Sequence, residues 1–136
     1  MRYNGVIQRK LALLDKQVQR LRESLKGISC EEFSQSWEKR SMTERALQVA
    51  VEIIIDVAER IIALDGAGPV ATAAEAMQLL ERLGVLESQN PYVDMVRFRN
   101  LILHQYEEID PGLLYNLATE RLDDFRKFRD EIDRAE

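Results

Sequence analysis

The first part of the chain carries a helical pattern of hydrophobic residues from Tyr3 to about Lys26. Apolar residues recur there at alternating spacings of four and three, which places them on one face of a helix. They are Ile7, Leu11, Leu14, Val18, Leu21 and Leu25. Gly27 is suited to end this helix, because glycine takes the left-handed backbone conformation without a steric penalty. The seam lasts only about three heptads, so it predicts a helix packed in a bundle rather than a free coiled coil.

Three later stretches have the capping-box pattern, in which serine or threonine is followed three residues on by glutamate at the start of a helix. They are Ser29 to Glu32, Ser41 to Glu44 and Thr72 to Glu75. The first predicts a short helix whose Phe33 and Trp37 pack together at one end of the core, since residues four apart share a helix face. The second predicts a helix to about Leu64. The third predicts a helix to about Leu83, which Gly84 ends.

The helix predicted up to Leu64 is apolar on more than one side and keeps only a thin polar stripe. The stripe consists of Arg45, Gln48, Glu52, Asp56 and Glu59. A helix this apolar is buried on two faces. It is therefore expected to be either the central helix of the bundle or a helix shared with a partner.

The pairs Asn90-Pro91 and Asp110-Pro111 predict the starts of the last two helices, because a capping side chain followed by proline suits the first helical position. One helix should run from Tyr92 to roughly Glu108, and the other from Asp110 to about Arg134 with a charged, solvated tail. The core positions of the last helix are Leu114, Leu117, Leu122, Phe125 and Ile132. No stretch predicts a strand. The sequence thus predicts an all-α fold with one domain over residues 1–136, an up-down four-helix bundle with one or two extra short helices.

Composition and charge narrow the class of protein without changing this fold. The chain has 46% hydrophobic and 32% charged residues, which is ordinary for a globular protein. Its net charge of −5 argues against a general nucleic-acid coating protein, although it permits a local basic site. Cys30 is the single cysteine, so no internal disulfide and no zinc-binding spacing are expected. Without a signal segment or a run of about 20 apolar residues, the sequence predicts a cytoplasmic protein with no membrane contact.

The stretch Arg99-Asn100-Leu101-Ile102-Leu103-His104-Gln105-Tyr106 places polar residues late in a strongly patterned helix and holds the single histidine. On a helical wheel, one half of this helix is predicted to pack into the bundle. That half contains Phe98, Leu101, Ile102, Gln105 and Ile109. The opposite half mixes apolar and polar residues, namely Val96, Arg99, Asn100, Leu103, His104 and Tyr106. Such a face predicts a contact or pocket surface, and a symmetric dimer that buried it together with the over-apolar helix would explain both features.

The chemistry that this face offers is narrow. It has a general acid or base, a guanidinium, an amide and a phenol, but no metal-ligand cluster, phosphate-binding loop or nucleophile beside His104. The set suits cleavage of RNA by its own 2′-hydroxyl, with His104 taking the proton and Arg99 stabilising charge on the phosphate. Because such cleavage needs a base and an acid, the single histidine favours a site completed by a second copy of the chain. The simpler alternative is a semi-buried structural His104 and a surface cation at Arg99.

The pattern of Arg99, Asn100, His104 and Tyr106 resembles the signature of HEPN-domain toxins, specifically the HepT-like group of type VII toxin–antitoxin systems. The resemblance covers the whole chain in helix order and size. It implies a HEPN-like bundle that dimerises through the motif helix. It also implies a metal-independent endoribonuclease without a cofactor, in which Arg99 and His104 are catalytic and Asn100 supports them. Because the chain is acidic, RNA binding is expected to rely on local positive charges, at Arg97, Arg99 and Arg45, doubled across the dimer.

The same resemblance implies a partner, a minimal nucleotidyltransferase antitoxin of the MntA type, which transfers AMP from ATP to the motif tyrosine, here Tyr106. Two alternatives stay open at this stage. One is a non-catalytic nucleotide-binding or regulatory module that partners a nucleotidyltransferase, with Arg99 and His104 holding nucleotide phosphates. The other is a helical dimer whose motif has no function.

Overall fold

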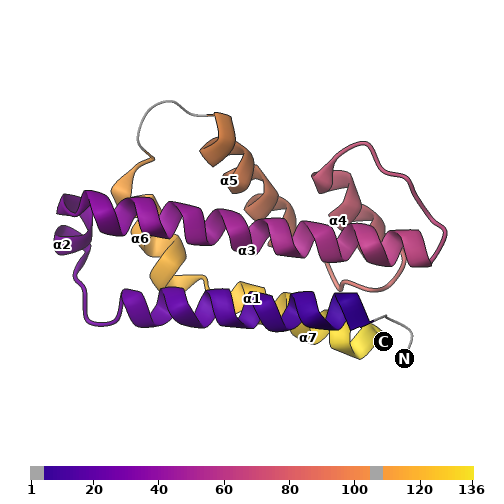
Figure 1. Cartoon of the computed structure of the whole chain (residues 1–136). Coiled ribbons are helices and arrows are strands. Elements are labelled where there is room, and N and C mark those ends of the chain that lie inside the picture. Colours follow the sequence, from indigo (N-terminus) through magenta and orange to yellow (C-terminus); the bar gives the residue numbers. More distant parts are fainter. Residues whose placement is uncertain (1–4, 105–108) are drawn as a thin grey trace.

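The computed structural model describes residues 5–104 and 109–136, and within these ranges the chain forms seven helices and no strand (Figure 1). The helices are α1 (Gly5–Ser24), α2 (Cys30–Gln35), α3 (Trp37–Leu64), α4 (Ala73–Arg82), α5 (Tyr92–His104), α6 (Pro111–Glu120) and α7 (Asp123–Ala135). The all-α prediction is confirmed.

The two longest helices, α1 and α3, lie antiparallel along the length of the molecule (Figure 1). The predicted seam of α1 is buried except for Val18, which is half-buried and packs against the core. Gly27 follows α1 with a φ of 78°, in the region that only glycine adopts easily, so it ends the helix as predicted.

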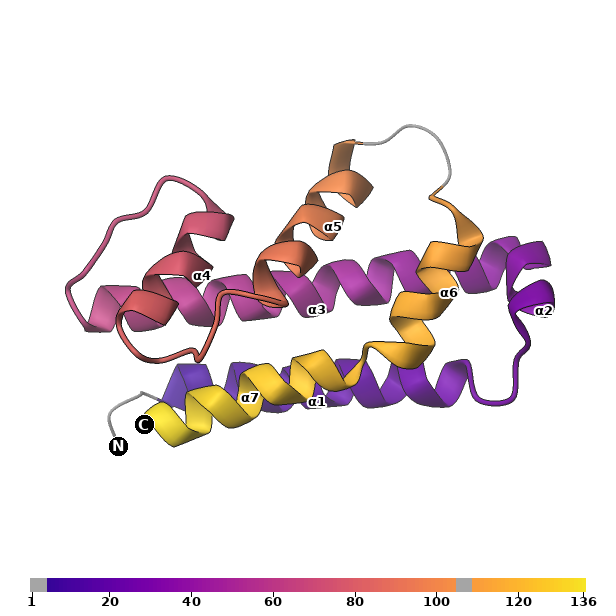
Figure 2. The ribbon, with the colours of Figure 1, turned by 180° about the vertical axis from the view of Figure 1, so that it is seen from behind.

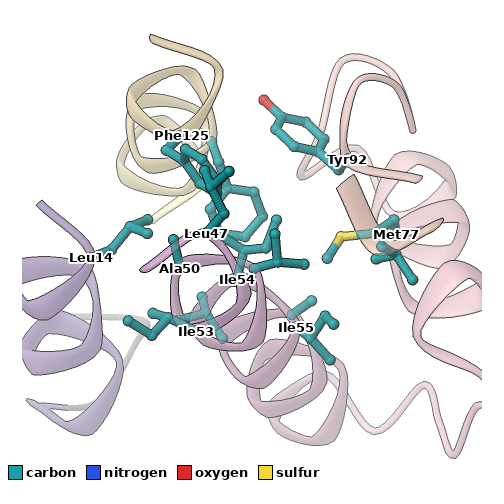
Figure 3. Packing of buried hydrophobic residues seen from close by; sticks show 14 of the residues in the cluster. Leu14, Leu47, Ala50, Ile53, Ile54, Ile55, Met77, Tyr92 and Phe125 are labelled. Carbon is teal, nitrogen blue, oxygen red and sulfur yellow. The ribbon is translucent and has the colours of Figure 1, made fainter. Parts of the chain in front are cut away.

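Helix α3 is the centre of the fold and contacts α1, α2, α4, α5 and α6. Figure 3 shows Ile53 on the side of α3 that faces Leu14, and Ile55 on the side that faces Met77. Ile54 between them is fully buried. The chain therefore buries two faces of α3 by itself. Of the two alternatives for this helix, the central one is correct, and its hydrophobicity is no evidence for a second copy.

The start of α3 differs from the prediction. The helix begins at Trp37, because Ser36 adopts an extended backbone and its side chain accepts a hydrogen bond from the Lys39 amide at 3.1 Å. The pattern from Ser41 to Glu44 lies inside the helix and caps nothing, so that prediction was wrong: an earlier cap was available.

The predicted contact between Phe33 and Trp37 was also wrong. Phe33 is fully buried on α2 and its ring lies 5.5 Å from that of Tyr115 on α6, whereas Trp37 is 68% exposed. The two residues belong to different helices separated by Ser36, so the four-residue spacing does not place them on one face.

Three other helix-start predictions are confirmed, those for α2, α4 and α6. The hydroxyl of Ser29 accepts from the Glu32 amide at 3.1 Å, and the Glu32 carboxylate accepts from the Ser29 amide at 3.2 Å. Thr72 accepts from the Glu75 amide at 3.1 Å at the start of α4. Asp110 caps α6 through the Leu113 amide, with proline in the first turn. At Asn90-Pro91 the prediction is off by one residue, because α5 begins at Tyr92 and Pro91 precedes the helix.

The last part of the chain forms two helices, where one was predicted. It breaks at residues 121–122 between α6 and α7 and changes direction there (Figure 2). The break lets α6 pack on α2 and α3 while α7 runs along α1. The predicted core positions are buried, apart from Leu117, which is half-buried. The charged tail is not simply solvated, because Phe128 and Glu131 are buried in it.

Candidate active site on helix α5

Helix α5 leaves the bundle as it proceeds. Its buried residues lie in its first turns and are Tyr92, Val93 and Val96. These turns contact α3 and α4, and the helix then tilts away from α3 toward its C-terminal end (Figures 1 and 2).

This tilt corrects the predicted orientation of the motif. At about 100° per residue, Tyr92 and Val96 lie within about 60° of Arg99 around the helix. The motif arginine is therefore on the same face of α5 as these buried residues, but nearer the C-terminal end, where the helix has tilted away from the bundle. Val96 was predicted to be on the exposed half and is buried, whereas Leu101 was predicted to be in the core and is 43% exposed. The predictions for Phe98 and Ile102 are confirmed, since both pack partly buried against the core.

The motif residues lie on the last turns of this protruding helix. Asn100 and His104 are exposed, and His104 is the last residue of α5. Arg99 is half-buried, and its Nε is buried with no hydrogen-bond partner within residues 5–104 and 109–136. Arg99, Asn100 and His104 thus lie on an arc of about 140° at one end of the helix. Tyr106, the predicted site of modification, lies outside the described residues.

The other predicted RNA-binding arginines have different surroundings. Arg97 is exposed and forms an ion pair with Asp94, with 3.3 Å between Nη1 and Oδ1. Both side chains are more than two-thirds exposed, so this pair is weak. Arg45 is exposed on α3.

Exposed leucines lie at the end of α5 and at the start of α6. Leu101 and Leu103 are 43% and 46% exposed in its last turn, and Leu113 is 42% exposed in the first turn of α6. The two helix ends lie on the same side of α3 (Figure 1). Apolar side chains left uncovered beside polar motif residues are typical of a contact surface.

A buried polar cluster fixes the base of α5, and the sequence did not reveal it. Glu131 on α7 is 3% exposed, and its carboxylate accepts a hydrogen bond from the Tyr92 hydroxyl and another from the Glu87 amide at 2.8 Å. Burial, together with the neighbouring Glu131 carboxylate, raises the pKa of Tyr92 well above its usual range, so the phenol remains a donor. One signal was available: Phe125, Phe128 and Ile132 form a helical apolar stripe, and Glu131 lies next to it, about 60° from Phe128 around the helix.

Another flank of α5, on the side of Met95 and Phe98, borders a cavity. The cavity has a volume of about 90 Å³ and is lined in part by Met95 and Phe98 of α5, by Val51 of α3 and by Phe125 of α7. Among residues 5–104 and 109–136, no three metal-ligating side chains converge. None of the helices in this part of the chain is both long and apolar enough to span a membrane.

The chain is similar in sequence to known proteins. A family model described as ribonuclease HepT-like matches residues 14–132. Among curated proteins, the tRNA nuclease HepT of Aphanizomenon flos-aquae (strain 2012/KM1/D3) is 27% identical over 112 residues, which cover 81% of this chain and 76% of that protein.

Solved structures share the fold. A chain of the tri-AMPylated Shewanella oneidensis HEPN toxin in complex with the MNT antitoxin matches with a TM-score of 0.88 and 24% identity, over 98% of this chain and 100% of that one. A toxin–antitoxin structure with AMP-PNP matches with a TM-score of 0.89 and 24% identity over the same shares. The HEPN-like fold expected from the sequence is thereby confirmed.

Proposed function

Because the chain belongs to the ribonuclease HepT-like family, we propose that it is the ribonuclease toxin of a toxin–antitoxin pair. The observation that carries the proposal is the protruding end of α5, where Asn100 and His104 are exposed and Arg99 presents a guanidinium with an unpartnered, buried Nε within the described residues. Such groups suit a phosphodiester, because the arginine binds the phosphate and the histidine transfers protons.

The proposed reaction is attack by the RNA 2′-oxygen on the adjacent phosphorus. One His104 takes the 2′-hydroxyl proton as the new oxygen–phosphorus bond forms, and a second His104 gives a proton to the departing 5′-oxygen as its bond to phosphorus breaks. Arg99 stabilises the charge on the phosphate oxygens, with Asn100 beside it. The products are a 2′,3′-cyclic phosphate and a 5′-hydroxyl, so the step needs neither a metal ion nor an organic cofactor.

The two histidines come from two copies of the chain, because the sequence contains only one. Leu101, Leu103 and Leu113 support this part of the proposal, since they leave an apolar surface uncovered beside the motif. A two-fold dimer that buried this surface would bring both copies of the end of α5 together.

We further propose that a minimal nucleotidyltransferase silences the site. Its reaction joins the Tyr106 hydroxyl to the α-phosphate of ATP and releases pyrophosphate. Tyr106 follows Arg99 by only seven residues in the sequence. An added phosphate there would compete with RNA for the arginine. The test is co-expression with the nucleotidyltransferase, followed by intact-mass and peptide analysis, with Tyr106→Phe as the control that gains no AMP there.

The activity is tested by incubating the purified chain with RNA in the presence of EDTA. The relative's name makes tRNA the first substrate to try. We expect cleavage that leaves cyclic phosphate ends and that His104→Ala abolishes. Cleavage that requires a divalent metal ion, or that His104→Ala leaves unchanged, would contradict the proposal. Tight AMP binding without RNA cleavage would favour the alternative of a regulatory nucleotide-binding module.

A further inference from the structure

We propose that Glu131 is a positioning residue for this site: it anchors the first residue of α5 and thereby sets where Arg99 and His104 project. Glu131 lies on α7, far from the motif in sequence, and touches none of the motif residues through the contacts described above. The inference rests on the proposed function for its catalytic consequence, but its structural part stands on the contacts of Glu131 alone.

The geometry of the anchor is specific. One carboxylate oxygen of Glu131 accepts from the Tyr92 hydroxyl and the other accepts from the Glu87 amide at 2.8 Å, so both oxygens are used. Tyr92 is fully buried, and its ring meets that of Phe128 edge-on, with centroids 5.2 Å apart at 74°. Glu131 therefore joins three segments: the loop before α5, the start of α5 and helix α7.

Burying a carboxylate at this position costs more free energy than burying an apolar side chain. Removing a charge from water is unfavourable, and its two hydrogen-bond donors here are neutral groups. Well-packed apolar side chains of similar volume often stabilise a core at least as well as buried charged groups. Apolar contacts are not directional, whereas hydrogen bonds are. The Glu87 amide holds the Glu131 carboxylate in place, and the carboxylate in turn fixes the position of the Tyr92 hydroxyl.

The contact between Glu131 and Tyr92 affects the position of the motif residues farther along α5. Tyr92 precedes Arg99 by two turns, about 10 Å along the axis, and lies within about 20° of it around the helix. Beyond its first turns α5 tilts out of the bundle, and its buried residues, Tyr92, Val93 and Val96, all lie in its first half. Packing therefore holds the outer half of α5 less firmly than its base, and a rotation or tilt at Tyr92 is carried to Arg99 and His104.

The test compares four variants with the wild-type protein. Glu131→Leu removes both acceptors. Tyr92→Phe removes one donor and is the milder substitution. Glu131→Gln keeps the shape and can accept from the Glu87 amide while donating to the Tyr92 oxygen, so it is the conservative variant. Asp130→Leu, at the exposed neighbouring position, is the matched control.

Two readouts are taken on each folded variant: hydrogen exchange of the α5 amides relative to those of α1 and α3, and the rate of RNA cleavage. For Glu131→Leu and Tyr92→Phe we expect faster exchange confined to α5, and a loss in kcat/KM of about 10- to 100-fold, the scale expected when a catalytic group is misplaced by about an ångström. We expect Glu131→Gln and Asp130→Leu to stay close to the wild type.

The outcomes separate the two proposals. If the wild-type protein cleaves no RNA, the proposed function fails, and hydrogen exchange alone then decides whether Glu131 anchors α5. If Glu131→Leu does not fold, Tyr92→Phe carries the test. Exchange in α5 and cleavage rates that match the wild type in Tyr92→Phe, or exchange that rises equally in α1, α3 and α5, would overturn the anchor.

Discussion

His104 is the last residue of α5 and its side chain is exposed, so the imidazole contributes little packing to the fold. The same holds for Asn100, whereas Arg99 is half-buried with an unpartnered Nε within the described ranges. The proposed catalytic role predicts this pattern, because catalytic side chains act on the bound RNA and need few contacts within the free chain.

This separation gives a prediction for His104→Ala. We expect its free energy of unfolding to stay within about 0.5 kcal/mol of the wild type, because surface substitutions rarely change it more. RNA cleavage should fall by about 10²- to 10⁴-fold, the usual contribution of a general acid or base. Urea unfolding and the cleavage assay measure the two quantities on the same sample. A large loss of stability would instead make His104 a structural residue.

The sequence singled out Arg99, Asn100 and His104 as candidates because their signal is local: polar residues at short spacing in an apolar helix. It did not reveal Glu131, whose burial depends on Tyr92, 39 positions away in the chain. A carboxylate in a charged tail normally faces solvent, and the position of Glu131 next to the apolar stripe of α7 was too weak a signal to predict its burial.

At the scale of helices, local signals predicted most boundaries and failed where two signals competed. Ser29, Thr72 and Asp110 cap helices as predicted. The pattern at Ser41 failed because Ser36 had already started the same helix. The break between α6 and α7 has no glycine or proline to mark it, and it follows from the need of the two segments to pack on different neighbours.

The pairing of α1 with α3 includes one ion pair that can be tested by pH. Burial alone would raise the pKa of Asp56, but the hydrogen bond and charge of Lys10, at 2.5 Å, and the charge of Arg60 hold the pKa below its ordinary value of 3.8. A lowered pKa in the folded state means that the ionised carboxylate stabilises the fold above the unfolded-state pKa. This contribution is lost as pH falls through the folded-state pKa, below 3.8.

We therefore expect Asp56→Asn to be less stable than the wild type at pH 7, by less than about 1 kcal/mol because the pair is partly exposed. The difference should shrink as the pH falls below 3.8. Urea unfolding of both proteins at a series of pH values measures it. A difference that stays constant into acid would show that the charge on Asp56 does not contribute.

At the scale of the whole molecule, the structure changes the argument for a dimer. The two-sided hydrophobicity of α3 is explained within one chain, since α1 covers one side of it and α4 and α5 cover others. The case for a second copy now rests on the single histidine and on the uncovered leucines at the end of α5. Sequence alone could not separate these features, because it shows that a helix is apolar but not what covers it.

The leucine surface gives its own prediction. Leu103→Asp should halve the mass measured by light scattering and abolish RNA cleavage, because a charge buried in an apolar interface is strongly unfavourable. Leu13→Asp is the matched control, since Leu13 is 49% exposed on α1 and Leu103 is 46% exposed. The control should keep the mass and activity of the wild type. Equal masses for both variants would place the interface elsewhere.

The central claim is a ribonuclease site that needs His104 from two copies of the chain, and mixed assemblies test it most directly. Wild-type and His104→Ala chains, co-expressed in known ratios and purified together, are assayed for RNA cleavage. If both copies are required, activity falls as the square of the wild-type fraction, to about one quarter when the two are equal. A linear fall, to about one half at equal amounts, would show that each chain works alone and would contradict the account.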